Sequence, residues 1–168
     1  MTILDDFPIL SRIRRNHGLE HATITLLSQR FPYIRLAGYS YPGGFFLLGD
    51  VPTDQVREVV VQALARMNNG ERSLAIHPNC GTNYAVSGIL AGMLAWLGMF
   101  GTKSRRRQIE RLPLVITLAT LGFMASAPLG PKVQEYITTS GDPQGLAVVD
   151  IFPVRFGRFS IHRVITEG

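Results

Sequence analysis

The sequence predicts an α+β protein, in which a small head of two helices and a β-sheet carries an inserted transmembrane helical hairpin. Two apolar stretches without charged residues, 80–102 and 112–131, lie in the second half of the chain. Each is about as long as the ~20 residues that a spanning helix needs. The segments around them show the spacings of helices and strands. We therefore divide the chain into an N-terminal part of the head (1–80), the hairpin (81–131) and C-terminal strands that join the head (132–168).

The N-terminal part of the head begins with a predicted helix from Phe7 to Phe31. Its apolar residues recur at helical spacing, at Leu10, Ile13, Ile24, Leu27 and Phe31. Two predicted strands follow, over residues 34–40 and 43–50, around the glycine-containing turn Tyr41-Pro42-Gly43-Gly44. The sequence therefore predicts a first helix followed by a β-hairpin.

A second helix is predicted over residues 54–69, because its apolar residues form one face: Val56, Val59, Val60, Ala63, Leu64 and Met67. Thr53 can cap its start, and Gly70 is well placed to end it. Residues 73–77 are predicted to form a third strand, and residues 145–165 have strand-like composition. We expect all strands to share one sheet, since both segments lie on the same side of the predicted hairpin.

The excess of basic residues is confined to one short segment. The chain has 17 Lys and Arg against 12 Asp and Glu. Residues 1–80 hold eight basic and seven acidic residues, and residues 112–168 hold four of each, so the excess lies mainly in the expected loop 103–111. The aromatic and basic segment 155–163 fits a strand whose arginines face water or lipid headgroups. A nucleic acid is therefore not an expected partner.

The two uncharged stretches predict a protein of the cell membrane with two spans, and hence the lipid bilayer as a partner. Small residues at helical spacing, at Gly88 and Gly92 and again around Gly122, would let the two helices approach closely. Two rules disagree about the side on which the head lies. The basic segment favours a cytoplasmic tip, whereas the N-terminal sequence does not resemble a signal peptide that would export the head. Both orientations stay open.

Several short motifs together resemble one bacterial family. They are N-H-G-L-E-H-A-T-I at residues 16–24, P-G-G-F-F at 42–46, G-D-V at 49–51 and H-P-N-C-G-T-N at 77–83. The combination resembles an uncharacterised family of integral membrane proteins from photosynthetic and related bacteria, a domain of unknown function. This resemblance implies a small head with a membrane anchor and leaves the activity open.

Histidine and cysteine residues in two of these motifs are candidate ligands of zinc. His17 and His21 are four residues apart, so both lie on one face of the predicted helix and can reach one ion. His77 and Cys80 place an imidazole and a thiol three residues apart in a predicted turn. The predicted site therefore consists of these four residues, and His162 is a further candidate.

The segment His17–His21 also resembles the H-x-x-E-H motif of the inverted zinc peptidases. That resemblance implies that Glu20 is a general base for a zinc-bound water. Those peptidases are larger and take a third ligand, a glutamate, from a later helix, whereas the corresponding region here is an apolar stretch without glutamate.

Three interpretations stay open. The first is a non-catalytic, membrane-anchored metal-binding subunit that acts in assembly or as a scaffold, with a membrane-protein partner or a second copy. The second is a membrane-bound zinc hydrolase that uses Glu20. The third is a histidine cluster that is only packed and hydrogen-bonded within the head. Whether the protein is an enzyme is therefore open.

Overall fold

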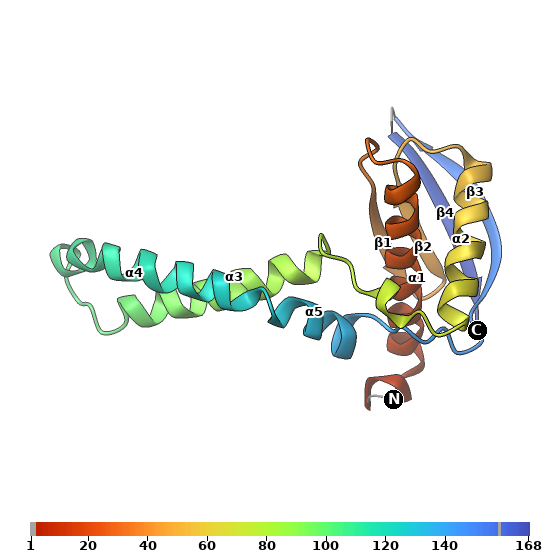
Figure 1. Cartoon of the computed structure of the whole chain (residues 1–168). Coiled ribbons are helices and arrows are strands. Elements are labelled where there is room, and N and C mark those ends of the chain that lie inside the picture. The colour runs from red at the N-terminus through yellow and green to blue at the C-terminus, as the bar shows by residue number, and fades with distance from the viewer. Residues whose placement is uncertain (1–2, 158) are drawn as a thin grey trace. The chain divides into compact units, whose positions relative to one another are not determined.

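The chain folds into two compact units, a head and a helical hairpin unit (Figure 1). The computed structural model describes residues 3–157 and 159–168. The head combines Met1–His77 with Glu135–Gly168, and the hairpin unit comprises Pro78–Gln134.

The head contains a four-stranded antiparallel sheet in the order β1-β2-β4-β3. Strands β1 (Ala37–Tyr41) and β2 (Gly44–Leu48) form the hairpin predicted around Pro42 and Gly43. Strands β3 (Ala147–Phe156) and β4 (Phe159–Glu167) form a second hairpin, and β4 pairs with β2. The C-terminal strands therefore belong to the sheet of the head.

Two long helices cover one face of this sheet (Figure 1). Helix α1 (Pro8–Arg30) starts with a proline, which is favoured in the first turn, and α2 (Thr53–Asn68) ends just before Gly70, whose φ of 94° suits glycine. The largest buried apolar side chains of the core come from both helices and the sheet: Leu19, Leu27, Phe45, Leu47, Val56, Val59, Val60, Ile151 and Val164. The head is therefore α+β, as predicted.

Two details of the head differ from the prediction. Residues 73–77 do not form a strand, because Arg72–Ala75 is the short 3₁₀ helix η2. A short apolar run cannot by itself distinguish strand from helix. Thr53 is the first residue of α2 and does not cap it, since the residue at the cap position is Pro52.

The hairpin unit consists of α3 (Gly81–Met99) and α4 (Arg105–Ser126), followed by the short α5 (Leu129–Val133). The π-helical turn η3 (Gln134–Thr138) then leads into the head. Helices α3 and α4 are antiparallel and approach closely at Gly122, where a Cβ would lie 2.7 Å from the carbonyl oxygen of Leu90. The hydroxyls of Ser87 and Ser126 are 2.6 Å apart in the same interface. Gly88 and Gly92 do not contribute, because a Cβ at either position meets nothing within 4 Å.

The basic segment is mostly helical, whereas the sequence predicts a loop over residues 103–111. Helix α4 begins at Arg105, and the hydroxyl of Ser104 caps it by accepting a hydrogen bond from the amide of Arg107 (3.5 Å). Serine is a favoured residue at the start of a helix, and the loop prediction, which rested on the run of charges, did not take Ser104 into account.

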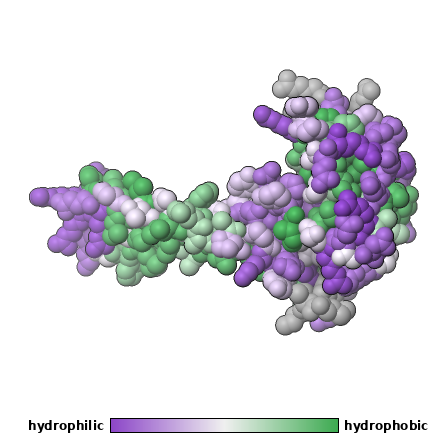
Figure 2. All heavy atoms as spheres, viewed as in Figure 1, coloured by the Kyte–Doolittle hydropathy of each residue, from purple (hydrophilic) through white to green (hydrophobic). Residues whose placement is uncertain are grey.

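Among the described residues, α4 is long and apolar enough to cross a membrane. Figure 2 shows apolar side chains along the middle of the hairpin unit and polar ones at the α3–α4 connection. Helix α3 does not meet the same criterion, since Thr82 and Asn83 make its first turn polar. One apolar helix is therefore established by length and composition, and the predicted second span is not.

Candidate metal centre

The N-H-G-L-E-H segment of α1 contacts several parts of the head, beginning with Asn16. The side chain of Asn16 is fully buried. Its amide donates to the carbonyl oxygens of Tyr41 (2.9 Å) and Pro42 (3.3 Å), and its side-chain oxygen accepts from the hydroxyl of Thr166 (2.6 Å). Asn16 therefore holds α1 against the β1–β2 turn and against β4.

Gly18 lies where the segment after η3 crosses α1. A Cβ at this position would lie 2.1 Å from the carbonyl oxygen of Ser140 and 3.3 Å from the Cβ of Ala75. The amide of Ser140 donates to the carbonyl oxygen of Arg14 (2.9 Å), so this segment is tied to the helix. Only glycine permits this close approach.

His17 and His21 are held by backbone carbonyl oxygens on two sides of Gly18. The Nδ1 atom of His17 is 2.9 Å from the oxygen of Thr138, and the Nδ1 atom of His21 is 2.7 Å from the oxygen of Ala75. A carbonyl oxygen can only accept, so each Nδ1 donates its hydrogen, and Nε2 is the ring nitrogen that remains for a ligand bond. Imidazoles that bind metals are oriented in this way.

Three imidazoles lie next to one another in the head. The ring centroids of His17 and His21 are 4.3 Å apart in an edge-to-face arrangement, and the ring of His77 is 5.7 Å from that of His21. Burial, and then repulsion from His21, lower the pKa of His77. A lowered pKa keeps His77 neutral at physiological pH, and the neutral imidazole is the form that binds metals.

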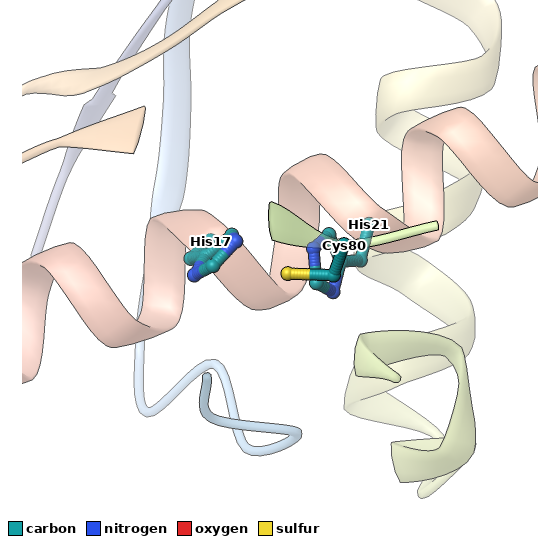
Figure 3. A group of neighbouring side chains, drawn as sticks. All are labelled: His17, His21 and Cys80. Carbon is teal, nitrogen blue, oxygen red and sulfur yellow. The ribbon is translucent and has the colours of Figure 1, made fainter. Parts of the chain in front are cut away.

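Cys80 follows His77 by three residues and occupies the cap position of α3, where its sulfur accepts from the amide of Thr82 (3.4 Å). The ligand atoms of His17, His21 and Cys80 lie within 4.8 Å of one another, and this group could hold a metal ion (Figure 3). Zinc with bonds of 2.0–2.3 Å places tetrahedral ligand atoms about 3.5 Å apart.

The fourth predicted ligand, His77, and the further candidate His162 lie outside this group of three. His77 neighbours His21 but is not one of the three, and His162 is buried on β4, where its Nε2 is 3.1 Å from the hydroxyl of Thr53. The Nδ1 of His162 is buried without a hydrogen-bond partner among the described residues. Burial lowers the pKa of His162, so its ring is neutral at physiological pH.

Glu20 contacts the edge strand β1. Its side chain is buried, and its carboxylate accepts a hydrogen bond from the hydroxyl of Ser40. A Cβ at Gly38 would lie 2.3 Å from Oε1 of Glu20, so the glycine makes room for the carboxylate. Burial raises the pKa of Glu20, while the Ser40 hydrogen bond and the nearby His17 oppose that rise. The carboxylate is therefore hydrogen-bonded to β1 and lies near His17, and its role as a base stays a prediction.

Two buried arginines of α1 belong to the same region and have no counterpart in the sequence prediction. Arg14 donates to the carbonyl oxygens of Tyr136 (3.2 Å) and Thr139 (3.1 Å), and Arg15 donates to that of Gly168 (3.1 Å). Both side chains are less than a tenth exposed. The only sequence signal is their position directly after Ile13, within the predicted apolar stripe of the helix.

A cleft of about 860 Å³ opens beside these segments of the head. Its lining includes Arg14, Ala75 and Thr139, together with Arg72 and Asp142, whose side chains form an exposed ion pair at 3.5 Å. The carbonyl oxygen of Ala75 holds His21, so the cleft borders one of the segments that position the histidines.

Comparison with known proteins assigns the chain to a family. Residues 12–151 match the family described as a domain of unknown function (DUF6391). An uncharacterised protein from Picosynechococcus sp. is 36% identical over 152 residues, which cover 83% of this chain and 71% of that protein. No solved structure matches the chain. The expected resemblance to a family of unknown function is confirmed, and the chain belongs to the DUF6391 family.

Proposed function

We propose that the protein is a membrane-anchored zinc-binding protein, in which the ion has a structural and not a catalytic role. One observation carries the proposal: the Nδ1 atoms of His17 and His21 are both bound by backbone carbonyl oxygens, at 2.9 and 2.7 Å. This orientation leaves Nε2 as the ring nitrogen that remains for a ligand bond on two adjacent rings. Neutral imidazoles in such an arrangement are suited to one transition-metal ion.

The full ligand set in this proposal is His17, His21, His77 and Cys80. The ring of His77 already lies beside that of His21, and Cys80 follows it by three residues, so the two can reach the same ion. Three imidazoles and a thiolate favour zinc over magnesium or calcium, which prefer oxygen ligands. Four protein ligands make a closed tetrahedral site without a position for water, which is typical of structural zinc.

The position of Glu20 supports a non-catalytic role. A general base must reach a metal-bound water, whereas Glu20 is bound to Ser40 and packs on Gly38. In this proposal, Glu20 fixes α1 against β1 and acts on the site only by positioning the helix. A membrane-bound zinc hydrolase is the second candidate, and the cleft of about 860 Å³ beside Ala75 and Thr139 is the feature that favours it.

The membrane anchor in this proposal is the pair α3 and α4 as two spans, with α5 following on the side of the head. Both helices expose large apolar side chains that fit lipid tails: Ile89, Met93, Trp96, Leu97, Ile116, Leu121, Phe123 and Met124. The close packing at Gly122 would stabilise the helix pair within the bilayer, where the hydrophobic effect does not drive helices together. As a scaffold or assembly subunit, the protein would use these surfaces to contact another membrane protein or a second copy.

Elemental analysis of the purified full-length protein tests the zinc site. We expect one zinc per chain, lost in His17→Ala and in His21→Ala but kept in His162→Ala, which removes a buried histidine outside the group. Glu20→Gln should also keep the zinc. Wild-type protein without zinc, or equal zinc in His17→Ala, would overturn the site. Loss of a peptidase or esterase activity in Glu20→Gln with zinc retained would favour the hydrolase.

Membrane insertion is tested separately by extraction. The protein should stay in the membrane fraction in alkaline carbonate and be released only by detergent. Release by carbonate alone would contradict the anchor while leaving the metal site standing.

A further inference from the structure

The α3–α4 connection carries a group of exposed basic side chains, here called the tip cluster: Lys103, Arg105, Arg106, Arg107 and Arg111. The segment from Lys103 to Arg111 contains a single acidic residue, Glu110. No other stretch of nine residues outside this region carries as large a net positive charge, which is +4 over residues 103–111.

Two members of the tip cluster have partners within the hairpin unit. Arg106 forms an ion pair with Glu110 at 2.9 Å. Arg111 donates to the carbonyl oxygens of Phe100 (2.9 Å) and Gly98 (3.3 Å), so it caps the C-terminal end of α3. These two residues therefore have a structural role that accounts for their charge.

Lys103, Arg105 and Arg107 have no such role. In the part of the chain that the structure describes, their side chains form no ion pair and no hydrogen bond. Three cations held close together repel one another, and nothing in the hairpin unit neutralises them. Their charge is therefore available to an external anion.

The position of these arginines also opposes local helix stability. Arg105 and Arg107 lie in the first turn of α4, which contains no acidic residue. The first turn of a helix carries partial positive charge and is stabilised by acidic side chains and destabilised by basic ones. A local arrangement that opposes folding in this way is expected where a function requires it. An anion at this end of the helix would neutralise both the side chains and the helix terminus.

The residues next to the tip cluster indicate which anion. Trp96 and Phe100 are 61% and 63% exposed, and their rings lie edge to face at 5.0 Å. Exposed aromatic side chains of this kind favour the boundary between lipid tails and headgroups. On the other helix, the exposed Leu112 and Leu114 directly follow the basic residues. The seven residues from Arg105 to Arg111 rise by about 10 Å, which is enough to cross a headgroup layer of roughly 5–8 Å.

We propose that the tip cluster binds the phosphate groups of anionic phospholipids, and selects them over zwitterionic lipids through Lys103, Arg105 and Arg107. This inference rests on the membrane insertion of α3 and α4 proposed above. Each basic residue near an anionic membrane surface strengthens binding roughly fivefold. The three residues together therefore give enough selectivity to measure.

Trp96 is the single tryptophan of the chain and lies near the tip cluster, so it serves as the reporter. The full-length protein is reconstituted into bilayers of equal parts phosphatidylglycerol and phosphatidylcholine, with bromine, which quenches tryptophan, on the tails of only one lipid. Wild-type Trp96 should be quenched more strongly when phosphatidylglycerol carries the bromine. The relative affinity should be at least roughly fivefold at low salt, the contribution of a single basic residue, and the difference should shrink in 1 M salt.

The variant Lys103→Gln/Arg105→Gln/Arg107→Gln should bring the relative affinity close to one. It keeps the Arg106–Glu110 pair and the Arg111 cap, and it removes charges that oppose the helix, so α4 should stay folded. The matched control Arg35→Gln/Arg57→Gln/Arg72→Gln removes the same charge from the head and should keep the selectivity. Lys103→Arg/Arg105→Lys/Arg107→Lys should keep it as well.

The outcomes separate the two proposals. Equal quenching by both brominated lipids, or selectivity that survives in the tip variant, would overturn lipid recognition by the tip cluster and leave membrane insertion standing. Absence of quenching by either lipid would overturn the membrane insertion and, with it, the lipid recognition.

Discussion

Replacing Gly18 by alanine tests whether the close approach of the 138–140 segment to α1 holds the histidines in place. The new Cβ would lie 2.1 Å from the carbonyl oxygen of Ser140, which is a backbone atom, so the segment must move by about 1 Å. The shift weakens three hydrogen bonds: His17 to Thr138, Arg14 to Thr139, and the Ser140 amide to Arg14. Each contributes about 1 kcal/mol, and alanine regains about 1 kcal/mol of helix propensity. The expected net loss is about 2 kcal/mol.

Thermal unfolding of the zinc-free, full-length protein in detergent, followed by circular dichroism, measures this loss. A change of this size lowers the Tm of a domain of this length by roughly 4–8 °C. Fluorescence is unsuitable, because the single tryptophan lies in α3 and not in the head. The matched control is Gly88→Ala, a helical glycine where a Cβ meets nothing within 4 Å, and its Tm should be unchanged or slightly raised. An unchanged or higher Tm for Gly18→Ala would refute the reasoning.

Three further predictions concern buried groups and the helix interface. Burial raises the pKa of Glu20, so the stability of the wild-type protein should fall as pH rises above the ordinary carboxyl range. Glu20→Gln should remove that fall when thermal melts at pH 5 and pH 8 are compared. An equal pH dependence in both proteins would contradict this. Burial lowers the pKa of His162, so the stability of the wild-type protein should be retained above about pH 6.5 and lost as pH falls below it. In the same melts, His162→Leu should reduce that loss. Gly122→Ala should lower the melting temperature reported by Trp96 fluorescence, because the new Cβ would lie 2.7 Å from the carbonyl oxygen of Leu90. Gly92→Ala should leave the melting temperature unchanged, since a Cβ at that position meets nothing within 4 Å.

The parts of the fold that could be predicted from the sequence depend on periodic patterns. The apolar spacing of α1 and α2 and the glycine turn between β1 and β2 are local features, and the structure has each of them close to the expected residues. The segment 73–77 has no such period, and its conformation depends on tertiary contacts, including the hydrogen bond from His21 to Ala75. Prediction therefore failed where the local pattern was too short to decide.

The histidines of the site could be singled out from their spacing, whereas the residues that orient them could not. His17 and His21 are bound by carbonyl oxygens of Thr138 and Ala75, which lie far from them in sequence. Every residue has a backbone carbonyl group, so the amino-acid sequence does not reveal which carbonyl oxygens bind the histidines. Gly18 lowers helix propensity in isolation, and only its contact with Ser140 reveals why glycine is needed there.

X-ray absorption at the zinc edge of the purified full-length protein tests the central claim most directly. The proposed site predicts about three nitrogen neighbours at roughly 2.0–2.1 Å and one sulfur at roughly 2.3 Å. The sulfur can come only from Cys80 or a methionine, since the chain has one cysteine, and Cys80→Ser should therefore replace it by an oxygen or nitrogen neighbour. Protein without stoichiometric zinc, or zinc surrounded by oxygen alone, would contradict the account.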